Sequence, residues 1–218
     1  MCRTSVVAVE RAPEDLTARA RIRDAALRMF AERGIGPTTI RDIAAAAGVS
    51  SGLVRHHFGS KDALRDACDA YAMDQSNRIR EQMFAEGRLA DAGFMGSVHP
   101  TARLLQRYLV RSLMDGSEAA AAMFDEMVEI GERWVAASEV ETHDLRAFSA
   151  VLVAMQMGVF LMHDQLSRTL GIDIETTEGW IRMNVAFLDA FSQPLLTPEQ
   201  TAAIHAALDR LRAHPPKE

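Results

Sequence analysis

The chain has 218 residues, of which 48 % are apolar and 6 % aromatic, and its formal net charge is −6. This length suits one large domain or two small ones with a substantial core, and the abundance of alanine, leucine and methionine favours helices over sheets. The two cysteines, Cys2 and Cys68, have no paired spacing, which excludes a cysteine zinc motif and a disulfide framework and fits a reducing cytoplasm.

No segment has the pattern of a targeting or membrane-spanning sequence. The amino-terminal apolar run SVVAV is too short for a signal peptide. The longest apolar stretch, from Ala150 to Met162, is interrupted by Gln156 and is too short to cross a bilayer. We therefore expect a cytoplasmic protein.

The charge is distributed unevenly along the chain. Residues 1–61 contain ten Lys or Arg and six Asp or Glu, whereas residues 62–218 contain fourteen and twenty-four. A net negative charge argues against nucleic-acid binding, but a basic head on an acidic body is typical of proteins that make this contact. The alternative is that these charges only solvate helix surfaces.

The amino-terminal quarter predicts a disordered arm over residues 1–15 and then four helices. The first helix starts at Thr17 and ends at Gly34, because its apolar residues recur with helical spacing. Thr38 or Thr39 can cap a second, short helix that Gly48 ends. The other expected features are a third helix, capped by Ser50 or Ser51 and reaching about His57, and a fourth from Lys61 to about Gly87 with Ser60 as its N-cap.

The remaining residues predict a loop and five more helices. Residues 87–100 are rich in glycine and end in Pro100, which indicates the loop. No run alternates with a period of two, so the fold class is all-α. The five helices are expected at residues 101–115, 118–137, 143–170, 177–192 and 198–213.

The segment GVSSGLVRHHFGSK, residues 48–61, matches the G-x-S-x-G nucleophile elbow of hydrolases. That motif must follow a strand and precede a helix, but here it follows the alanine-rich helical segment RDIAAAA. The elbow is therefore rejected. Two short helices joined by AGVS, with Gly48 at the sharp turn, instead predict a helix-turn-helix.

The second helix of this pair leaves Ser51, Gly52, Arg55 and His56 free to face outward. Glycine permits close approach to a DNA backbone, and arginine can bind a guanine edge or a phosphate. Thr39 and Lys61 lie at helix N-termini, which attract phosphate. The alternative is ordinary solvated side chains, with His57 packed behind the motif.

Residues 17–64 resemble the TetR family of one-component transcriptional regulators, through the stretches ALRMFAERGIGPTTIRDIAAAAGVS and SGLVRHHFGSKDAL. The resemblance implies a three-helix DNA-binding domain over residues 16–60 and a six-helix ligand-binding and dimerisation bundle over residues 61–218. Arg55 departs from the family pattern, in which a tyrosine that contacts phosphate commonly stands there. The residues expected at DNA are Thr39, Ser51, Gly52, Arg55, His56 and Lys61.

The acidic body contains candidates for an effector pocket. Ser149, Gln156 and His163 are spaced by seven, so on one helix they would share a face, and a buried polar stripe needs partners. Apolar side chains nearby could line a pocket, although such residues more often form ordinary core. The predicted lining is Tyr108, Met123, Phe124, Met127, Trp134, Leu152, Gln156, Phe160 and His163.

No cofactor or metal site is expected. The pairs His143-Asp144 and His163-Asp164 lie twenty residues apart on one expected helix, which is about 30 Å, so they cannot share an ion.

The last two expected helices each carry an apolar stripe, which could pack within the chain or against a second copy. The resemblance favours a homodimer, with a predicted interface of Ile181, Val185, Leu188, Ile204, Leu208 and Leu211.

These patterns predict a ligand-responsive DNA-binding repressor. It would bind an inverted-repeat operator as a dimer and be released by a small, largely apolar molecule. Activation is not excluded by the sequence. The competing hypotheses are an enzyme built on the helical body, which lacks a nucleophile–base spacing, and a helical interaction protein that no longer binds DNA.

Overall fold

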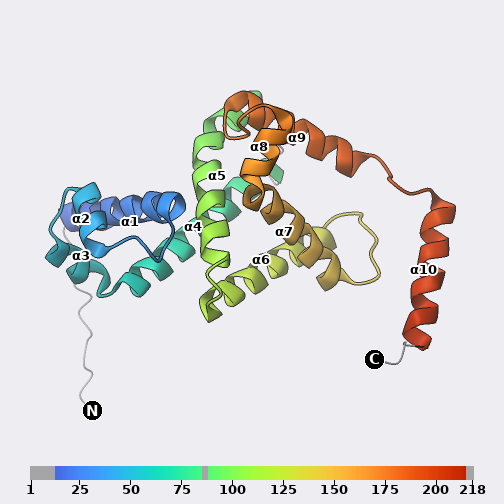
Figure 1. The fold of residues 1–218 in the computed structure, drawn as a ribbon, viewed down its shortest axis with the longest axis horizontal. Coiled ribbons are helices and arrows are strands. Elements are labelled where there is room, and N and C mark those ends of the chain that lie inside the picture. Colours follow the sequence, from blue (N-terminus) through green and yellow to red (C-terminus); the bar gives the residue numbers. More distant parts are fainter. Residues whose placement is uncertain (1–12, 85–87, 215–218) are drawn as a thin grey trace, which may run out of the picture. The chain divides into compact units, whose positions relative to one another are not determined.

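A computed structural model describes residues 13–84 and 88–214, and these residues form helices and no strand (Figure 1). The all-α fold class is therefore confirmed. The elements are α1 Pro13–Arg33, α2 Ile40–Ala47, α3 Ser51–Phe58, α4 Lys61–Phe84, the 3-10 turn η1 Arg88–Ala90, α5 Ala92–Leu113, α6 Glu118–Ala136, α7 Leu145–Leu161, α8 His163–Leu170, α9 Thr177–Ser192 and α10 Pro198–Ala213.

Helix α1 is amphipathic, as its spacing predicts. Ile22, Ala26 and Phe30 are completely buried and face α2, α4 and α5. The helix starts at Pro13, so residues 13–15 are helical and do not belong to the expected disordered arm. The rest of that arm, residues 1–12, lies outside the described residues. A proline at the first helical position explains this start, because its missing N–H has no partner there in any case.

The same core continues into α4 and α5. Leu64 and Cys68 of α4 and Leu105 of α5 are almost completely buried in it. Full burial of a large apolar side chain stabilises the fold by about 1.5–3 kcal/mol. Burial also raises the pKa of the Cys68 thiol to about 12, so this cysteine is an inert core residue.

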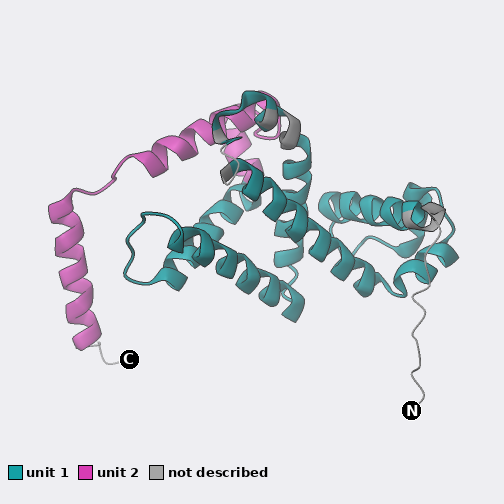
Figure 2. Ribbon diagram, turned by 180° about the vertical axis from the view of Figure 1, so that it is seen from behind, with its two compact units in different colours: residues 1–162 teal, residues 163–218 magenta. Residues whose placement is uncertain are grey.

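The contacts divide the chain into two compact units, residues 1–162 and 163–218 (Figure 2). The boundary expected from sequence, between residues 60 and 61, separates α3 from α4. One apolar core lies on both sides of that position, because α4 packs on α1 and α3 as well as on α5. The DNA-binding helices and α4 to α7 therefore belong to one unit by contacts.

The predicted loop over residues 87–100 is wrong for residues 88–100, and residue 87 lies outside the described residues. Helix α5 begins at Ala92 and contains Pro100, after the short turn η1. Glycines and an interior proline disfavour a helix, with a cost of about 3 kcal/mol for the proline. The burial of Leu105, Tyr108 and Leu109 farther along α5 outweighs this local cost.

The single helix predicted over residues 143–170 is also wrong. Helix α7 ends at Leu161 with Met162 as its C-cap, and α8 begins at His163. Ser149, Gln156 and His163 therefore do not form one stripe. Ser149 is completely buried, whereas Gln156 is exposed.

Helix α7 is also less covered than its apolar sequence predicts. It packs on α5 and α6, and Ser149 lies against Gly131 of α6, where an added Cβ would be 3.3 Å from the serine Cβ. Its other side leaves Val151 and Met155 at least half exposed. Among the described residues, no single helix is long and apolar enough to span a membrane, although α7 and α8 pass that test as a bent pair.

The connection between α8 and α9 packs closely on the start of α9. Gly179 is buried because the backbone of Asp173 and Ile174 lies directly against it. Thr176 caps α9 by accepting from the Gly179 N–H, and its hydroxyl donates to the Asp173 carbonyl over 2.7 Å. The backbone N–H of Ile174 donates to the Ser167 hydroxyl of α8 over 3.2 Å.

Replacing Gly179 by alanine should therefore destabilise the protein. Helix propensity alone would favour alanine by about 0.5–1 kcal/mol. The added Cβ, however, would lie 2.6 Å from the Ile174 Cα and still closer to the Asp173 carbonyl oxygen. We expect a net loss of about 1–3 kcal/mol in the free energy of unfolding, measured with urea.

The control is Gly158→Ala in α7, whose Cβ would meet nothing within 4 Å. It should leave stability unchanged or raise it by about 0.5–1 kcal/mol. Equal stability of the Gly179→Ala variant and the unmodified protein would show that residues 173–174 do not pack on α9.

Candidate nucleic-acid interface

A reciprocal capping box fixes the start of α2. The Asp42 N–H donates to the Thr39 hydroxyl oxygen over 3.2 Å, and the Thr39 N–H donates to the Asp42 carboxylate over 3.1 Å. The Thr39 hydroxyl also donates to that carboxylate over 2.6 Å. These bonds from Thr39 lower the pKa of Asp42 and keep it ionised at the helix N-terminus. Thr39 is exposed but already engaged in this cap.

Gly48 makes the turn between α2 and α3. Its φ of 65° lies in the left-handed region, which glycine adopts without strain. The Val49 N–H returns to the Ala44 carbonyl over 3.0 Å, and Ser50 caps α3 by accepting from Leu53 N–H over 3.1 Å. The G-x-S-x-G segment thus follows a helix, which removes the structural basis for a nucleophile elbow.

Helix α3 has a buried face and an exposed face. Val54 and Phe58 are 0 % and 9 % exposed and pack into the core. Gly52, Arg55 and His56 are exposed, and Ser51 is half-buried. The helix therefore presents the small and cationic residues that the sequence predicts for DNA contact.

Arg19 of α1 holds the end of α3 in place. Its Nη1 donates to the His57 carbonyl over 2.8 Å, and its guanidinium lies 4.4 Å from the centroid of the Phe58 ring. His57 is half-buried, which agrees with the expectation that it packs behind the motif. The sequence alone does not indicate Arg19, because its role depends on a contact between residues 38 positions apart.

Lys61 lies at the first position of α4, after Ser60, whose hydroxyl accepts from the Ala63 N–H over 3.0 Å. The lysine Nζ donates to the Gly36 carbonyl over 2.9 Å and so bridges α4 to the loop between α1 and α2. This bond leaves two of the three ammonium N–H groups for other acceptors. Lys61 thus lies at the N-terminus of α4 and is bonded to the loop that leads into α2.

A buried polar network joins α4 to α5 and to the turn before α6. Arg65 and Asp69 of α4 face each other with Nε and Oδ2 3.5 Å apart, and Arg65 also forms an ion pair with Asp115. The hydroxyl groups of Tyr108 and Ser112 donate to Asp69 Oδ1 over 2.6 and 2.8 Å. The patterns considered above do not predict this network, although the i, i+4 spacing of Arg65 and Asp69 indicates that these two side chains can pair.

Ion pairs and hydrogen bonds offset the cost of burying the charges in this network, although the Arg65 Nε faces Asp69 at 3.5 Å without a hydrogen bond. Burial by itself would raise the pKa of Asp115, but hydrogen bonds from Ser117 and the Arg65 guanidinium outweigh this and lower it. Burial beside the Asp69 carboxylate raises the pKa of Tyr108, which therefore acts only as a neutral donor. These groups connect α4 to α5 and to the turn before α6.

The predicted effector residues lie in different environments in the described structure. Tyr108 and Met123 are buried in the core, Trp134 is 41 % exposed, and Gln156 is exposed. His163 belongs to the second compact unit. The other predicted lining residues are half-buried on α6 and α7, namely Phe124, Met127, Leu152 and Phe160. A shallow polar hollow beside α1, lined among others by Arg28 and Asp42, contains none of the predicted residues.

The predicted interface residues of α9 and α10 are all exposed, with fractions between 44 % for Ile181 and 68 % for Leu188. Phe191 on α9 is also 56 % exposed. Such apolar faces are ordinarily covered in the functional form of a protein.

Two family models match this chain. The model of bacterial regulatory proteins of the tetR family matches residues 22–68, and the tetracyclin repressor-like C-terminal domain matches residues 101–197. The chain belongs to the TetR family. This TetR-family protein is therefore a DNA-binding transcriptional regulator, and its family acts on operator DNA and small-molecule effectors rather than as enzymes.

Named relatives agree with this assignment. The regulator is 37 % identical over 161 residues to the HTH-type transcriptional regulatory protein RaaS of Mycobacterium tuberculosis, covering 70 % of this chain and 74 % of RaaS. It is 33 % identical over 171 residues to the HTH-type transcriptional repressor Rv3405c of the same organism, covering 76 % and 84 %. A solved gamma-butyrolactone receptor superposes with a TM-score of 0.52 at 25 % identity, covering 68 % of this chain and 81 % of the receptor.

The buried network predicts a large cost for Asp69→Ala. The substitution removes the acceptor of Tyr108 and Ser112 and leaves Arg65 with one carboxylate fewer in the interior. We expect the free energy of unfolding to fall by about 2–4 kcal/mol, measured by urea denaturation.

Asp74→Ala on the same helix is the matched control. Asp74 forms an i, i+4 pair with Arg78, but both side chains are more than half exposed. Its loss should cost less than about 0.5 kcal/mol. Equal effects of the two substitutions would show that the network at Asp69 adds no more stability than a surface ion pair.

Proposed function

We propose that this regulator is a repressor that binds an inverted-repeat operator as a homodimer and is released by a small, largely apolar molecule. The observation that carries the proposal is the exposed face of α3, with Gly52, Arg55 and His56 on it. The named repressor among its relatives supports the direction of regulation. Selection of bound fragments from random DNA tests the operator type, because a dimer should select an inverted repeat with half-sites about 34 Å apart or a multiple of that.

The proposed DNA contacts divide into positioning and base recognition. Thr39 and Lys61, at the starts of α2 and α4, would bind phosphates, where helix N-termini already favour anions. Ser51 and His56 could bond to either a base or a phosphate. Gly52 would let the α3 backbone approach closely, and Arg55 would bind a guanine edge or replace the phosphate contact of the usual tyrosine.

Arg55→Ala should weaken operator binding about 5- to 150-fold, the range of one good arginine contact, without changing the fold. Arg55 is exposed, so its removal leaves the core intact. Binding is measured by fluorescence anisotropy on the selected operator at several salt concentrations. A guanine contact predicts relaxed preference at one operator position, whereas a phosphate contact predicts uniform weakening and a shallower salt dependence.

Arg146→Ala is the control for the loss of one positive charge. Arg146 is an exposed arginine at the start of α7, paired with Asp125 of α6. The Arg146→Ala variant should bind the operator with an affinity within about twofold of the unmodified protein. Salt screens the interaction between a side chain and DNA phosphates when more than about 10 Å separates them. If Arg55→Ala binds the operator like the Arg146 variant, Arg55 does not lie at the interface.

We place the dimer interface on α9 and α10, the helices with the most exposed apolar faces. Ile181, Val185 and Leu188 recur on one side of α9. The residues Ile204, Leu208 and Leu211 do the same on α10. Two such helices from each copy would form a four-helix interface, which buries faces that water would otherwise surround.

Leu188→Asp should convert the dimer to a monomer and lower operator affinity. Leu188 is 68 % exposed, so an aspartate there costs the single chain little but would be buried without a partner in the interface. Light scattering after gel filtration measures the mass. The control is Met114→Asp, at a 63 % exposed apolar residue in the turn after α5, which should remain dimeric. A dimeric Leu188→Asp variant would exclude this face.

The effector would act on α6 and α7, and α4 would carry the change to DNA. Phe124, Met127, Leu152 and Phe160 supply half-buried apolar walls, and methionine adapts to varied ligands. Helix α4 joins Lys61 at one end to the Arg65–Asp69 network that holds α5. The effector must bind the non-DNA state more tightly than the DNA-bound state. Release of the selected operator by small apolar compounds measures this difference directly.

A further inference from the structure

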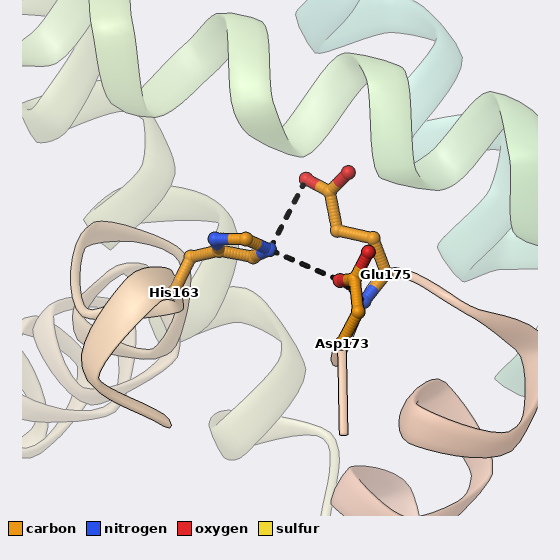
Figure 3. A group of neighbouring side chains, drawn as sticks. All are labelled: His163, Asp173 and Glu175. Atoms are coloured by element: carbon orange, nitrogen blue, oxygen red, sulfur yellow. Dashed lines mark hydrogen bonds and ion pairs between the residues drawn. The ribbon is translucent and has the colours of Figure 1, made fainter. Parts of the chain in front are cut away.

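A histidine and two carboxylates converge at the start of the second compact unit (Figure 3). His163 opens α8, and Asp173 and Glu175 lie in the connection to α9. Their ligand atoms all lie within 4.8 Å of one another. Neither the DNA-binding helices nor the proposed dimer face includes these residues.

The imidazole of His163 is oriented so that one nitrogen faces both carboxylates. Its Nδ1 lies 3.0 Å from the Asp164 carboxylate, which fixes the ring and makes Nδ1 the donor in the neutral form. The other nitrogen, Nε2, then carries a lone pair and points toward Asp173 Oδ1 at 3.4 Å and Glu175 Oε1 at 3.7 Å. In that neutral form the Nε2 lone pair faces two carboxylates, an arrangement that a cation bound between them would stabilise.

The distances fit a metal ion better than a direct hydrogen bond. A charge-assisted N–H to carboxylate bond has its heavy atoms about 2.7–2.9 Å apart, which is shorter than either separation here. Nitrogen and oxygen ligands about 2.0–2.1 Å from a tetrahedral zinc ion lie about 3.4 Å from each other. The 3.4 Å separation from Asp173 equals that spacing, the 3.7 Å separation from Glu175 is slightly longer, and all three ligand atoms lie within 4.8 Å of one another.

We propose that His163, Asp173 and Glu175 form a binding site for a divalent transition-metal ion of the zinc type. The donor set of one imidazole and two carboxylates suits such an ion, with solvent as the fourth ligand. Asp164 has the role of the outer carboxylate that orients a metal-bound histidine. His163 is 30 % exposed at its side chain and Asp173 59 %, so an ion can enter from solvent.

The connection that holds the two carboxylates is already ordered by its own bonds. The Glu175 N–H donates to Asp173 Oδ1 over 2.8 Å, and Thr176 and Ser167 bind the backbone on either side. Gly179 allows this backbone to lie against α9. His163 lies at the N-terminus of α8, so the positive end of the helix dipole repels a cation there. The negative charges of the carboxylates around His163 offset this repulsion. A bound ion would therefore fasten the α8–α9 connection without rearranging it.

The test is titration of the full-length protein with Zn²⁺, and with Co²⁺ as a spectroscopic probe. We expect one saturable ion per chain, a Co²⁺ absorption spectrum typical of tetrahedral coordination, and a melting temperature that rises with Zn²⁺. His163→Gln and Glu175→Gln should each weaken affinity by more than about tenfold, since even outer partners of metal ligands contribute that much. Asp164→Asn should weaken Zn²⁺ affinity by about tenfold, which is less than the effect of removing His163 or Glu175.

His143→Gln is the matched control, because His143 also precedes an aspartate but belongs to no such group of ligand atoms among the described residues. It should bind Zn²⁺ like the unmodified protein. Zn²⁺ binding that is unchanged in His163→Gln, or absent from the unmodified protein at micromolar concentrations, would overturn the proposal. A protonated His163 that pairs directly with Asp173 and Glu175, detected by NMR and indifferent to Zn²⁺, would also overturn it.

Discussion

The burial of Val54 and Phe58 is the interaction on which the DNA-facing surface depends. Helix α3 has eight residues, and an isolated helix of that length is unstable in water. Its shape comes from the core that α1, α4 and α5 build, together with the Ser50 cap, the left-handed Gly48 and the Arg19 bond to the His57 carbonyl. The side chains proposed to contact DNA thus contribute little to folding, and the buried residues behind them contribute most.

Helix α4 belongs to both the DNA-binding and the regulatory parts of this TetR-family chain. Its apolar side packs into the core beneath α3, and its polar side enters the Arg65–Asp69 network with α5. Movement of α5 relative to α4 would break several buried hydrogen bonds at once, so the two helices are expected to move together or to switch between discrete arrangements.

The second compact unit differs from the first in what stabilises it. Helices α1 to α6 share an extensive apolar core, whereas α9 and α10 expose most of their apolar side chains. Local bonds order the α8–α9 connection instead, through Ser167, Thr176 and the close packing on Gly179. A second copy at the apolar faces and a metal ion at His163 would supply the stabilisation that this unit does not draw from burial within its own chain.

Local sequence signals determined much of this fold. Capping residues and helical periodicity predicted both ends of α9 and α10 as observed and the ends of α6 to within one residue. The same signals predicted Gly48 as the end of α2 and Ser60 as the N-cap of α4. The exposed set Gly52, Arg55 and His56 followed from the same periodicity, because one face of α3 had to be apolar. These features depend on interactions within about four residues, which the sequence displays directly.

The tertiary structure decided the features that depend on distant partners. Burial of Leu105 and Tyr108 stabilises α5 enough for the helix to continue past Pro100. Gln156 is exposed, although the residues beside it in the sequence are apolar. The break at Met162 separated His163 from α7 and brought it to carboxylates ten and twelve residues away. Such contacts are set by how helices pack, and local spacing does not show which residues far apart in the chain will meet.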